Sequence, residues 1–145
     1  MSNHDQLTSD VKDNSQKLFG EDICWVDPPP ELKALTRRKP PDLVGKTSNG
    51  NIIIVEVKTE FDNTDKTNKL DGMDKSIGQV LRYAYAYVEE LICQDRKPSD
   101  ETLKEELKKF RLFIVGREHL QRLEDICQLL QAHGINTYHR VLPDN

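Results

Sequence analysis

The sequence has no long apolar run and only three cysteines, and its basic residues do not outnumber its acidic ones. No hydrophobic segment approaches the roughly 20 residues that a transmembrane helix needs, so we expect no membrane span. The first residues, Met-Ser-Asn-His-Asp, contain no basic region and no apolar stretch, and we expect no secretory signal there. These absences favour a cytoplasmic protein.

The cysteines and histidines are too scattered for a typical zinc site. Cys24, Cys93 and Cys127 form no C-x-x-C pair, and none of the four histidines stands beside a cysteine at metal-ligand spacing. Reduced thiols are therefore expected, as is usual for cysteines in a cytoplasmic protein.

The net charge also differs from that of a typical nucleic-acid-binding domain. It is −4, from 21 basic and 25 acidic residues, whereas such domains are usually basic. Nucleic-acid binding would therefore depend on a local patch, for which the candidates are Arg37, Arg38, Lys39 and Lys46. By charge alone, an ordinary solvated face is the simpler interpretation of these residues.

Hydrophobic patterns predict a single α/β domain over residues 1–145, a length that can bury its own core. Helices are expected at 5–19, 74–94 and 118–132, and strands at 23–26, 43–47, 51–58, 112–115 and 135–142. The order of these elements predicts an α/β sandwich with a mixed sheet. The polar segment 59–73 has few apolar anchors, so we expect a mobile loop there.

Two further expectations concern the helices. The long helix should bury a stripe of apolar residues at helical spacing, made of Ile77, Leu81, Ala84, Val88 and Leu91. A short helix should follow, with Ser99 as its N-cap and with apolar positions at Leu103, Leu107 and Phe110.

A turn signal between two apolar runs predicts a β-hairpin around residues 48–50. If the loop has three residues, with Gly50 in the left-handed conformation, Asp42 lies opposite Glu56 and both carboxylates project from one face. A two-residue turn would instead place Asp42 opposite Val57 and put the two acids on opposite faces. We therefore expect the three-residue loop.

Two charged side chains end the second strand of this hairpin. Glu56 and Lys58 are two residues apart and point to the same face. A salt bridge where a strand reaches the surface is the simpler explanation for the two residues alone. With Asp42 beside Glu56, however, the carboxylates form a hard oxygen site suited to Mg²⁺, to which the main-chain carbonyl of Val57 can contribute. Such a metal can lower the pKa of a bound water, and Lys58 can orient that water or assist its deprotonation.

These residues also resemble a known motif. Pro41-Asp42, thirteen intervening residues and Glu56-Val57-Lys58 are similar to the core motif of the PD-(D/E)XK nuclease superfamily. Gln79 and Tyr83, four residues apart on one helix face, resemble the QxxxY motif that many members carry after the core. Segments 17–22 and 77–84 resemble those of archaeal-type mismatch and branched-DNA endonucleases. The resemblance covers most of the chain.

The resemblance implies a restriction-endonuclease-like fold, a three-layer sandwich whose central mixed β-sheet is flanked by helices. It implies a Mg²⁺-dependent (or Mn²⁺-dependent) phosphodiester hydrolase, acting as a DNA endonuclease. The implied catalytic residues are Asp42, Glu56, Lys58, Gln79 and Tyr83; the implied metal ligands are Asp42, Glu56, Val57 and Asp10; the implied nucleic-acid contacts are Arg37, Arg38, Lys39, Lys46 and Arg82.

One position departs from the family pattern. Many members supply a metal-binding glutamate from the first helix, and residues 5–19 contain no glutamate. Asp10 is the candidate substitute, Asp13 is a second one, and a solvated helix face explains either residue equally well.

Two other kinds of function stay open at this point. The chain fits a nucleic-acid-binding or assembly module that has the nuclease fold without turnover, and the missing glutamate and the negative charge favour that alternative. It also fits a small nuclease subunit that works as a homodimer or obtains its specificity from a partner. The sequence does not choose between duplex, branched, mismatched and single-stranded DNA, or RNA.

Overall fold

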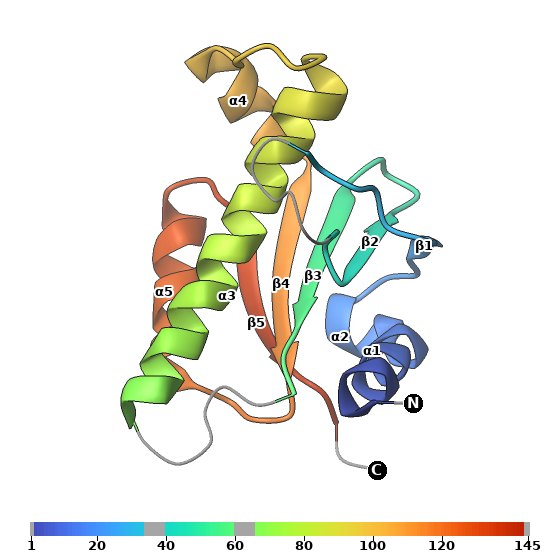
Figure 1. Cartoon of the computed structure of the whole chain (residues 1–145), viewed down its shortest axis with the longest axis vertical. Helices are drawn as coiled ribbons and strands as arrows, with labels where there is room; N and C mark the ends of the chain where they lie inside the picture. Colours follow the sequence, from blue (N-terminus) through green and yellow to red (C-terminus); the bar gives the residue numbers. More distant parts are fainter. Residues whose placement is uncertain (1, 34–39, 60–65, 144–145) are drawn as a thin grey trace.

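A five-stranded mixed sheet runs through the molecule, with helices on both of its faces (Figure 1). The computed structural model describes residues 2–33, 40–59 and 66–143, without the side chains of 66–71 and 73. The strands are β1 (Cys24–Val26), β2 (Leu43–Lys46), β3 (Ile52–Val57), β4 (Phe110–Gly116) and β5 (Thr137–Val141). They lie in this order across the sheet. The pairs β1–β2 and β2–β3 are antiparallel, and the pairs β3–β4 and β4–β5 are parallel.

The helices form the two outer layers. They are α1 (Asn3–Asp13), α2 (Ser15–Phe19), α3 (Lys66–Ala86), α4 (Asp100–Leu107) and α5 (Gln121–Ala132), and α3 continues into the π-helical segment η1 (Tyr87–Ile92). Leu7, Val11 and Leu18 of α1 and α2 share a core with one face of the sheet. Val80 and Leu123, from α3 and α5, share a core with the other face. The three-layer α/β sandwich expected from the sequence is thus confirmed. In the described ranges, no helix is both long and apolar enough to cross a membrane.

The β2–β3 hairpin has the predicted register. Val44 lies opposite Ile54, and Thr47 and Asn51 close the hairpin through a main-chain hydrogen bond of 3.0 Å. Gly50 has φ +85°, the left-handed conformation that a three-residue loop requires. Because side chains alternate along a strand, this register brings Asp42 and Glu56 to the same face of the sheet.

The middle strand of the sheet carries the most apolar sequence. All six residues of β3 are buried, because β2 and β4 flank the strand and helices cover both of its faces. Glu56, near the carboxyl end of β3, is therefore a buried carboxylate, with only 5% of its surface exposed. Such a group is expected to be paired or to bind a ligand.

The first helical segment differs from the prediction because it breaks at Asn14. The side chain of Asn14 donates a hydrogen bond of 2.8 Å to the carbonyl of Asp10, and the hydroxyl of Ser15 donates one of 2.6 Å to the carbonyl of Lys12. Side chains that bond to helix carbonyls in this way compete with continued helix. The predicted helix 5–19 is therefore two helices, and the first begins at Asn3.

The long helix begins earlier than predicted. Residues 66–73, expected to be a loop, form the first turns of α3. Gly72 and the polar composition of these residues do not predict a helix. Once the rest of α3 packs on the sheet, however, the helix can be extended by further residues, each of which adds one main-chain hydrogen bond. Residues 60–65 of the expected loop lie outside the described residues. The expected mobility of the loop therefore stays a prediction.

Two apolar residues also differ in place from the prediction. Leu91, assigned to the buried stripe, is 49% exposed. It lies in η1, where i→i+5 hydrogen bonds such as that from Cys93 to Val88 rotate the helix face out of the 3.6-residue period. Phe110, assigned to the short helix, is the first residue of β4 and pairs with Ile52 in the core.

Candidate active site

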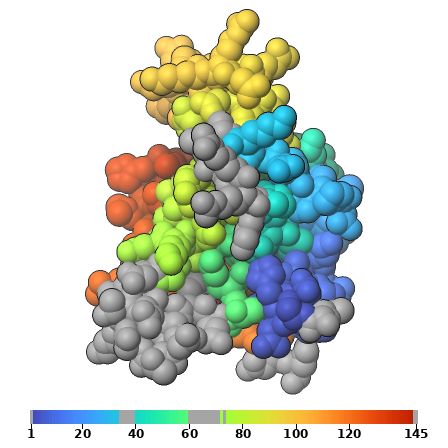
Figure 2. All heavy atoms as spheres, in the orientation of Figure 1, coloured from blue at the N-terminus to red at the C-terminus, as the bar shows by residue number. Residues whose placement is uncertain are grey.

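A pocket of about 360 Å³ lies at the carboxyl end of β3, where Glu56 and Lys58 emerge from the sheet. Asp42 enters it from the segment just before β2, Gln79 and Tyr83 from α3, and His4 from the first turn of α1. The remaining lining residues are Pro40, Val57 and Thr59. In the space-filling view, the α1 surface (dark blue) borders the chain near the end of β3 (green) (Figure 2).

The Asp42 carboxylate is held by the end of β3. Its Oδ2 atom accepts a hydrogen bond of 2.7 Å from the main-chain N–H of Val57. Asp42 follows Pro41 and is the last residue before β2. Its side chain therefore accepts a hydrogen bond from β3 directly beyond the last main-chain pair of the hairpin. The N–H and C=O of a strand residue point to the same side. The carbonyl of Val57 therefore also faces the Asp42 edge.

Glu56 is the most perturbed group in the pocket. Burial, reinforced by the neighbouring Asp42 carboxylate, raises the pKa of Glu56 to about 8, while Lys58 opposes the shift. Its Oε1 atom lies 3.6 Å from Nζ of Lys58. Its Oε2 atom is buried and has no hydrogen-bond partner among the described residues. A buried carboxylate oxygen without a partner is costly, and this cost indicates a ligand that is absent from the chain itself.

Lys58 is fixed from the helix side of the pocket. Its Nζ atom donates a hydrogen bond of 3.0 Å to Oε1 of Gln79, and its main-chain N–H donates one of 2.9 Å to the carbonyl of Val115 in β4. Tyr83 lies one helical turn beyond Gln79 and is buried beside the acids. Burial, reinforced by Glu56 and Asp42, raises the pKa of the Tyr83 phenol well above its ordinary value, so the hydroxyl stays protonated.

The donor atoms of the pocket fit a hard divalent cation. Two carboxylates lie side by side, one with an unpartnered buried oxygen, and a main-chain carbonyl faces the same edge. Oxygen donors of this kind suit Mg²⁺ or Mn²⁺, which also retain water ligands. The described residues contain no cluster of three or more His, Cys, Asp or Glu side chains placed to hold a metal. A cation here would therefore depend on the two acids, the carbonyl and water.

Asp10, the substitute proposed for the missing glutamate, does not line the pocket. Its Oδ2 atom lies 2.9 Å from Nη2 of Arg117, and its Oδ1 atom accepts a hydrogen bond of 3.0 Å from Gln6. Asp13, the second candidate, is exposed at the end of α1 and does not line the pocket either. Metal binding by either residue stays a prediction without a supporting contact.

The predicted nucleic-acid contacts are spread out. Arg37, Arg38 and Lys39 lie outside the described residues. Lys46 ends β2 four residues after Asp42, roughly 13 Å away at the usual rise of a strand. Arg82 lies on α3, three residues after Gln79, and its charge acts on Tyr83. Neither of these two described residues lines the pocket, and Arg82 is linked to it only through its charge effect on Tyr83.

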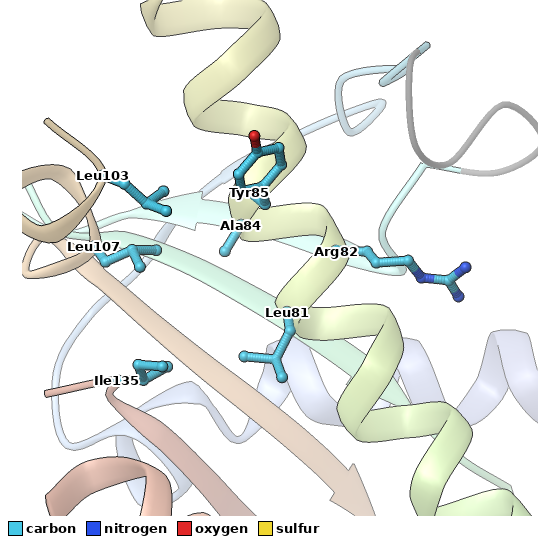
Figure 3. Close-up of a pocket in the computed structure, with 7 residues that line it drawn as sticks. All are labelled: Leu81, Arg82, Ala84, Tyr85, Leu103, Leu107 and Ile135. Atoms are coloured by element: carbon cyan, nitrogen blue, oxygen red, sulfur yellow. The ribbon is translucent and has the colours of Figure 1, made fainter. Parts of the chain in front are cut away.

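A second cavity, of about 310 Å³, lies on the other side of α3 and is almost entirely apolar (Figure 3). Leu81, Leu103, Leu107 and Ile135 surround it, whereas the guanidinium of Arg82 points away (Figure 3). Tyr85 also lines it, but no carboxylate, histidine or lysine of the described residues does, and the pocket at the end of β3 remains the candidate active site.

His4 is the residue of the pocket that sequence reasoning missed. Its Nε2 atom lies 3.3 Å from Oδ1 of Asp42. No spacing rule links a residue in the first turn of the first helix to an acid 38 positions later. Only the packing of α1 beside the end of β3 brings the two together.

No family model and no curated protein matches the sequence. Among solved structures, a repair endonuclease from Pyrococcus abyssi superposes with a TM-score of 0.51 at 16% identity, over 97% of this chain and 47% of that chain. A complex of EndoMS with double-stranded DNA gives a TM-score of 0.48 at 16% identity, over 100% of this chain and 47% of that chain. The chain thus spans about half the length of either protein. Its resemblance to PD-(D/E)XK nucleases is confirmed at the level of the fold, which is restriction-endonuclease-like.

Proposed function

We propose that the chain is a divalent-metal-dependent DNA endonuclease that hydrolyses phosphodiester bonds at the pocket of Asp42, Glu56 and Lys58. The observation that carries the proposal is the buried, unpartnered oxygen of Glu56 beside a second carboxylate and a lysine, in an open pocket. Each group is one that phosphodiester hydrolysis requires. The choice of DNA is supported by the fold shared with a repair endonuclease.

Asp42, Glu56 and the main-chain carbonyl of Val57 would hold the cation, Mg²⁺ or Mn²⁺. When bound, it supplies Lewis-acid activation of water and offsets the charge that builds on the phosphate. The Val57 N–H keeps the Asp42 carboxylate in place for this purpose. The raised pKa of Glu56 is expected to fall when a cation replaces the missing partner of Oε2.

Lys58 orients the reactants. An ammonium has three donors and no acceptor, and Nζ contacts Oε1 of Gln79 and Oε1 of Glu56. Its third donor is free to face the attacking water or a phosphate oxygen. The attacking water gives up one proton to solvent as its oxygen forms a bond to phosphorus, and the bond from phosphorus to the leaving sugar oxygen breaks. The leaving oxygen takes up a proton from solvent.

The selection of a DNA structure is a separate question. We propose that a second copy of the chain or a partner subunit contributes to this specificity.

A DNA-binding or assembly module without turnover is the second candidate. Two observations favour it: the described residues contain no cluster of three potential metal-binding side chains, and the Asp10 carboxylate is engaged by Arg117. This candidate predicts DNA binding that is unaffected by divalent metal.

A metal titration distinguishes the two candidates. Labelled duplex, branched, mismatched and single-stranded DNA are incubated with the protein in Mg²⁺, Mn²⁺ or EDTA. The nuclease proposal predicts cleavage of at least one DNA in metal, none in EDTA, and none by Asp42→Asn. Asp95→Asn is the matched control, because Asp95 is exposed, lies outside the pocket and has a positive φ that asparagine tolerates. Cleavage that persists in EDTA, or in Asp42→Asn, contradicts the proposal.

A further inference from the structure

The backbone around His4 is fixed by local hydrogen bonds. Ser2 and Asp5 form a capping box: the Ser2 hydroxyl accepts a bond of 3.0 Å from the Asp5 N–H, and the Ser2 N–H donates one of 3.4 Å to the Asp5 carboxylate. The Thr8 hydroxyl donates a bond of 2.8 Å to the His4 carbonyl. These bonds define where α1 begins and place His4 in its first turn.

Two nitrogen atoms from different elements lie close to the Asp42 carboxylate. His4 Nε2 lies 3.3 Å from Oδ1, and the Val57 N–H lies 2.7 Å from Oδ2. The Asp42 side chain is 18% exposed and that of His4 is 44% exposed. A carboxylate with a contact at each oxygen cannot rotate freely about its last bond. Its orientation toward Glu56 is therefore set jointly by α1 and β3.

These contacts leave room for a cation. Each carboxylate oxygen has two lone pairs, and each oxygen of Asp42 uses one of them for its contact. Each oxygen thus keeps a lone pair, and Asp42 neighbours Glu56, whose Oε2 has no hydrogen-bond partner among the described residues. Outer contacts to metal-binding carboxylates orient them, and their loss commonly weakens metal binding by roughly 10–100-fold.

We propose that His4 is a positioning residue, which holds the Asp42 carboxylate in the orientation that binds the divalent cation. The inference rests on the proposed function for the existence of that cation. The imidazole acts through Asp42 and is not itself a ligand: its Nε2 atom lies 3.3 Å from an Asp42 oxygen, and the described residues form no three-ligand cluster with it.

Metal affinity is the direct test. Free Mn²⁺ is followed by electron paramagnetic resonance as it is added to the wild type, His4→Ala and His4→Gln. His4→Ala should bind Mn²⁺ roughly 10–100-fold more weakly. His4→Gln should recover most of that loss, because the glutamine amide carries a donor at nearly the same reach. His133→Ala, an exposed histidine at the end of α5, should bind like the wild type.

Two outcomes overturn the role assigned to His4. One is a His4→Ala protein that binds Mn²⁺ as tightly as the wild type. The other is a pulsed spectrum of the Mn²⁺-loaded wild type that shows a directly coordinated histidine nitrogen, because His4 would then be a ligand. This spectrum needs no variant, and it decides the question even if His4→Ala does not fold.

The result for His4 is separable from the proposed function. A wild type that binds Mn²⁺ with the predicted His4 dependence but cleaves no DNA would contradict the nuclease proposal and leave the positioning role in place. Equal Mn²⁺ affinities with active cleavage would contradict only the positioning role. A wild type that binds no Mn²⁺ would overturn both.

Discussion

Nζ of Lys58 and Oε1 of Gln79 meet at 3.0 Å across the space between β3 and α3. This bond joins the end of β3, the strand that carries Glu56, to α3. Because Nζ also lies 3.6 Å from Oε1 of Glu56, the lysine is held between a neutral amide and a carboxylate. The amide fixes its direction without adding charge to the pocket.

Replacement of Gln79 by alanine should therefore slow cleavage without abolishing it. The lysine would retain its charge and lose its orientation, and we expect kcat to fall roughly tenfold, less than the roughly 10²–10⁴-fold that a positioned acid–base group contributes. DNA affinity should change little. Single-turnover cleavage and equilibrium binding measure the two effects, with Gln128→Ala on α5 as the matched control. A Gln79→Ala protein with a full cleavage rate contradicts this role.

Glu56 should make the metal-free protein less stable as the pH rises. In the unfolded chain it ionises near 4.5, and in the folded chain near 8. Between these values the folded protein binds more protons than the unfolded one, so the free energy of unfolding falls as pH rises through about 5 to 8, and then levels off. The loss should be on the order of 1–3 kcal/mol. Urea unfolding at several pH values in EDTA measures it.

Glu56→Gln isolates this effect from other titrating groups. Burial lowers the pKa of His139, so protonation of His139 reduces the free energy of unfolding as the pH falls. This effect has the opposite sign to that of Glu56 and is the same in both proteins. The glutamine variant should lose the decline between pH 5 and 8 and be more stable than the wild type at pH 8. Parallel stability curves for the two proteins would show that Glu56 is not perturbed in the folded state.

The register of the β2–β3 hairpin could be predicted because local chemistry determines it. Gly50 permits the positive φ of a three-residue loop, and the count of residues on each strand then places Asp42 opposite Glu56. The apolar run of β3 likewise identified a strand covered on both faces. Both features depend on residues close together in the sequence.

The features that could not be predicted depend on tertiary packing or on a helical irregularity. The contact of His4 with Asp42 and the pairing of Asp10 with Arg117 arise only when α1 lies against the sheet. The exposure of Leu91 follows from the π-helical turn of η1, which no 3.6-residue pattern contains. The amino-acid composition indicates neither the packing of α1 nor the π-helical turn.

Arg82 and Lys46 should contribute unequally to DNA binding. Arg82 lies on α3 three residues after Gln79, a residue that lines the pocket, whereas Lys46 lies at the opposite end of the hairpin. Arg82→Ala should weaken binding several-fold on all sequences and reduce the salt dependence by about one phosphate contact. Lys46→Ala should have the smaller effect. Binding isotherms at several salt concentrations test this order, and a larger effect for Lys46→Ala would contradict the placement of DNA over the pocket.

The most direct test of the account compares the wild type with Lys58→Ala in cleavage and in binding of the same DNA structures, with Mn²⁺ present. Lys104→Ala, an exposed lysine on α4, is the control for loss of one positive charge. We expect the wild type and Lys104→Ala to cleave, and Lys58→Ala to lose at least about 100-fold in rate. DNA binding by Lys58→Ala should fall only modestly. If the wild type and Lys58→Ala bind DNA equally well and neither cleaves any structure, the protein is a binding module and the nuclease account is wrong.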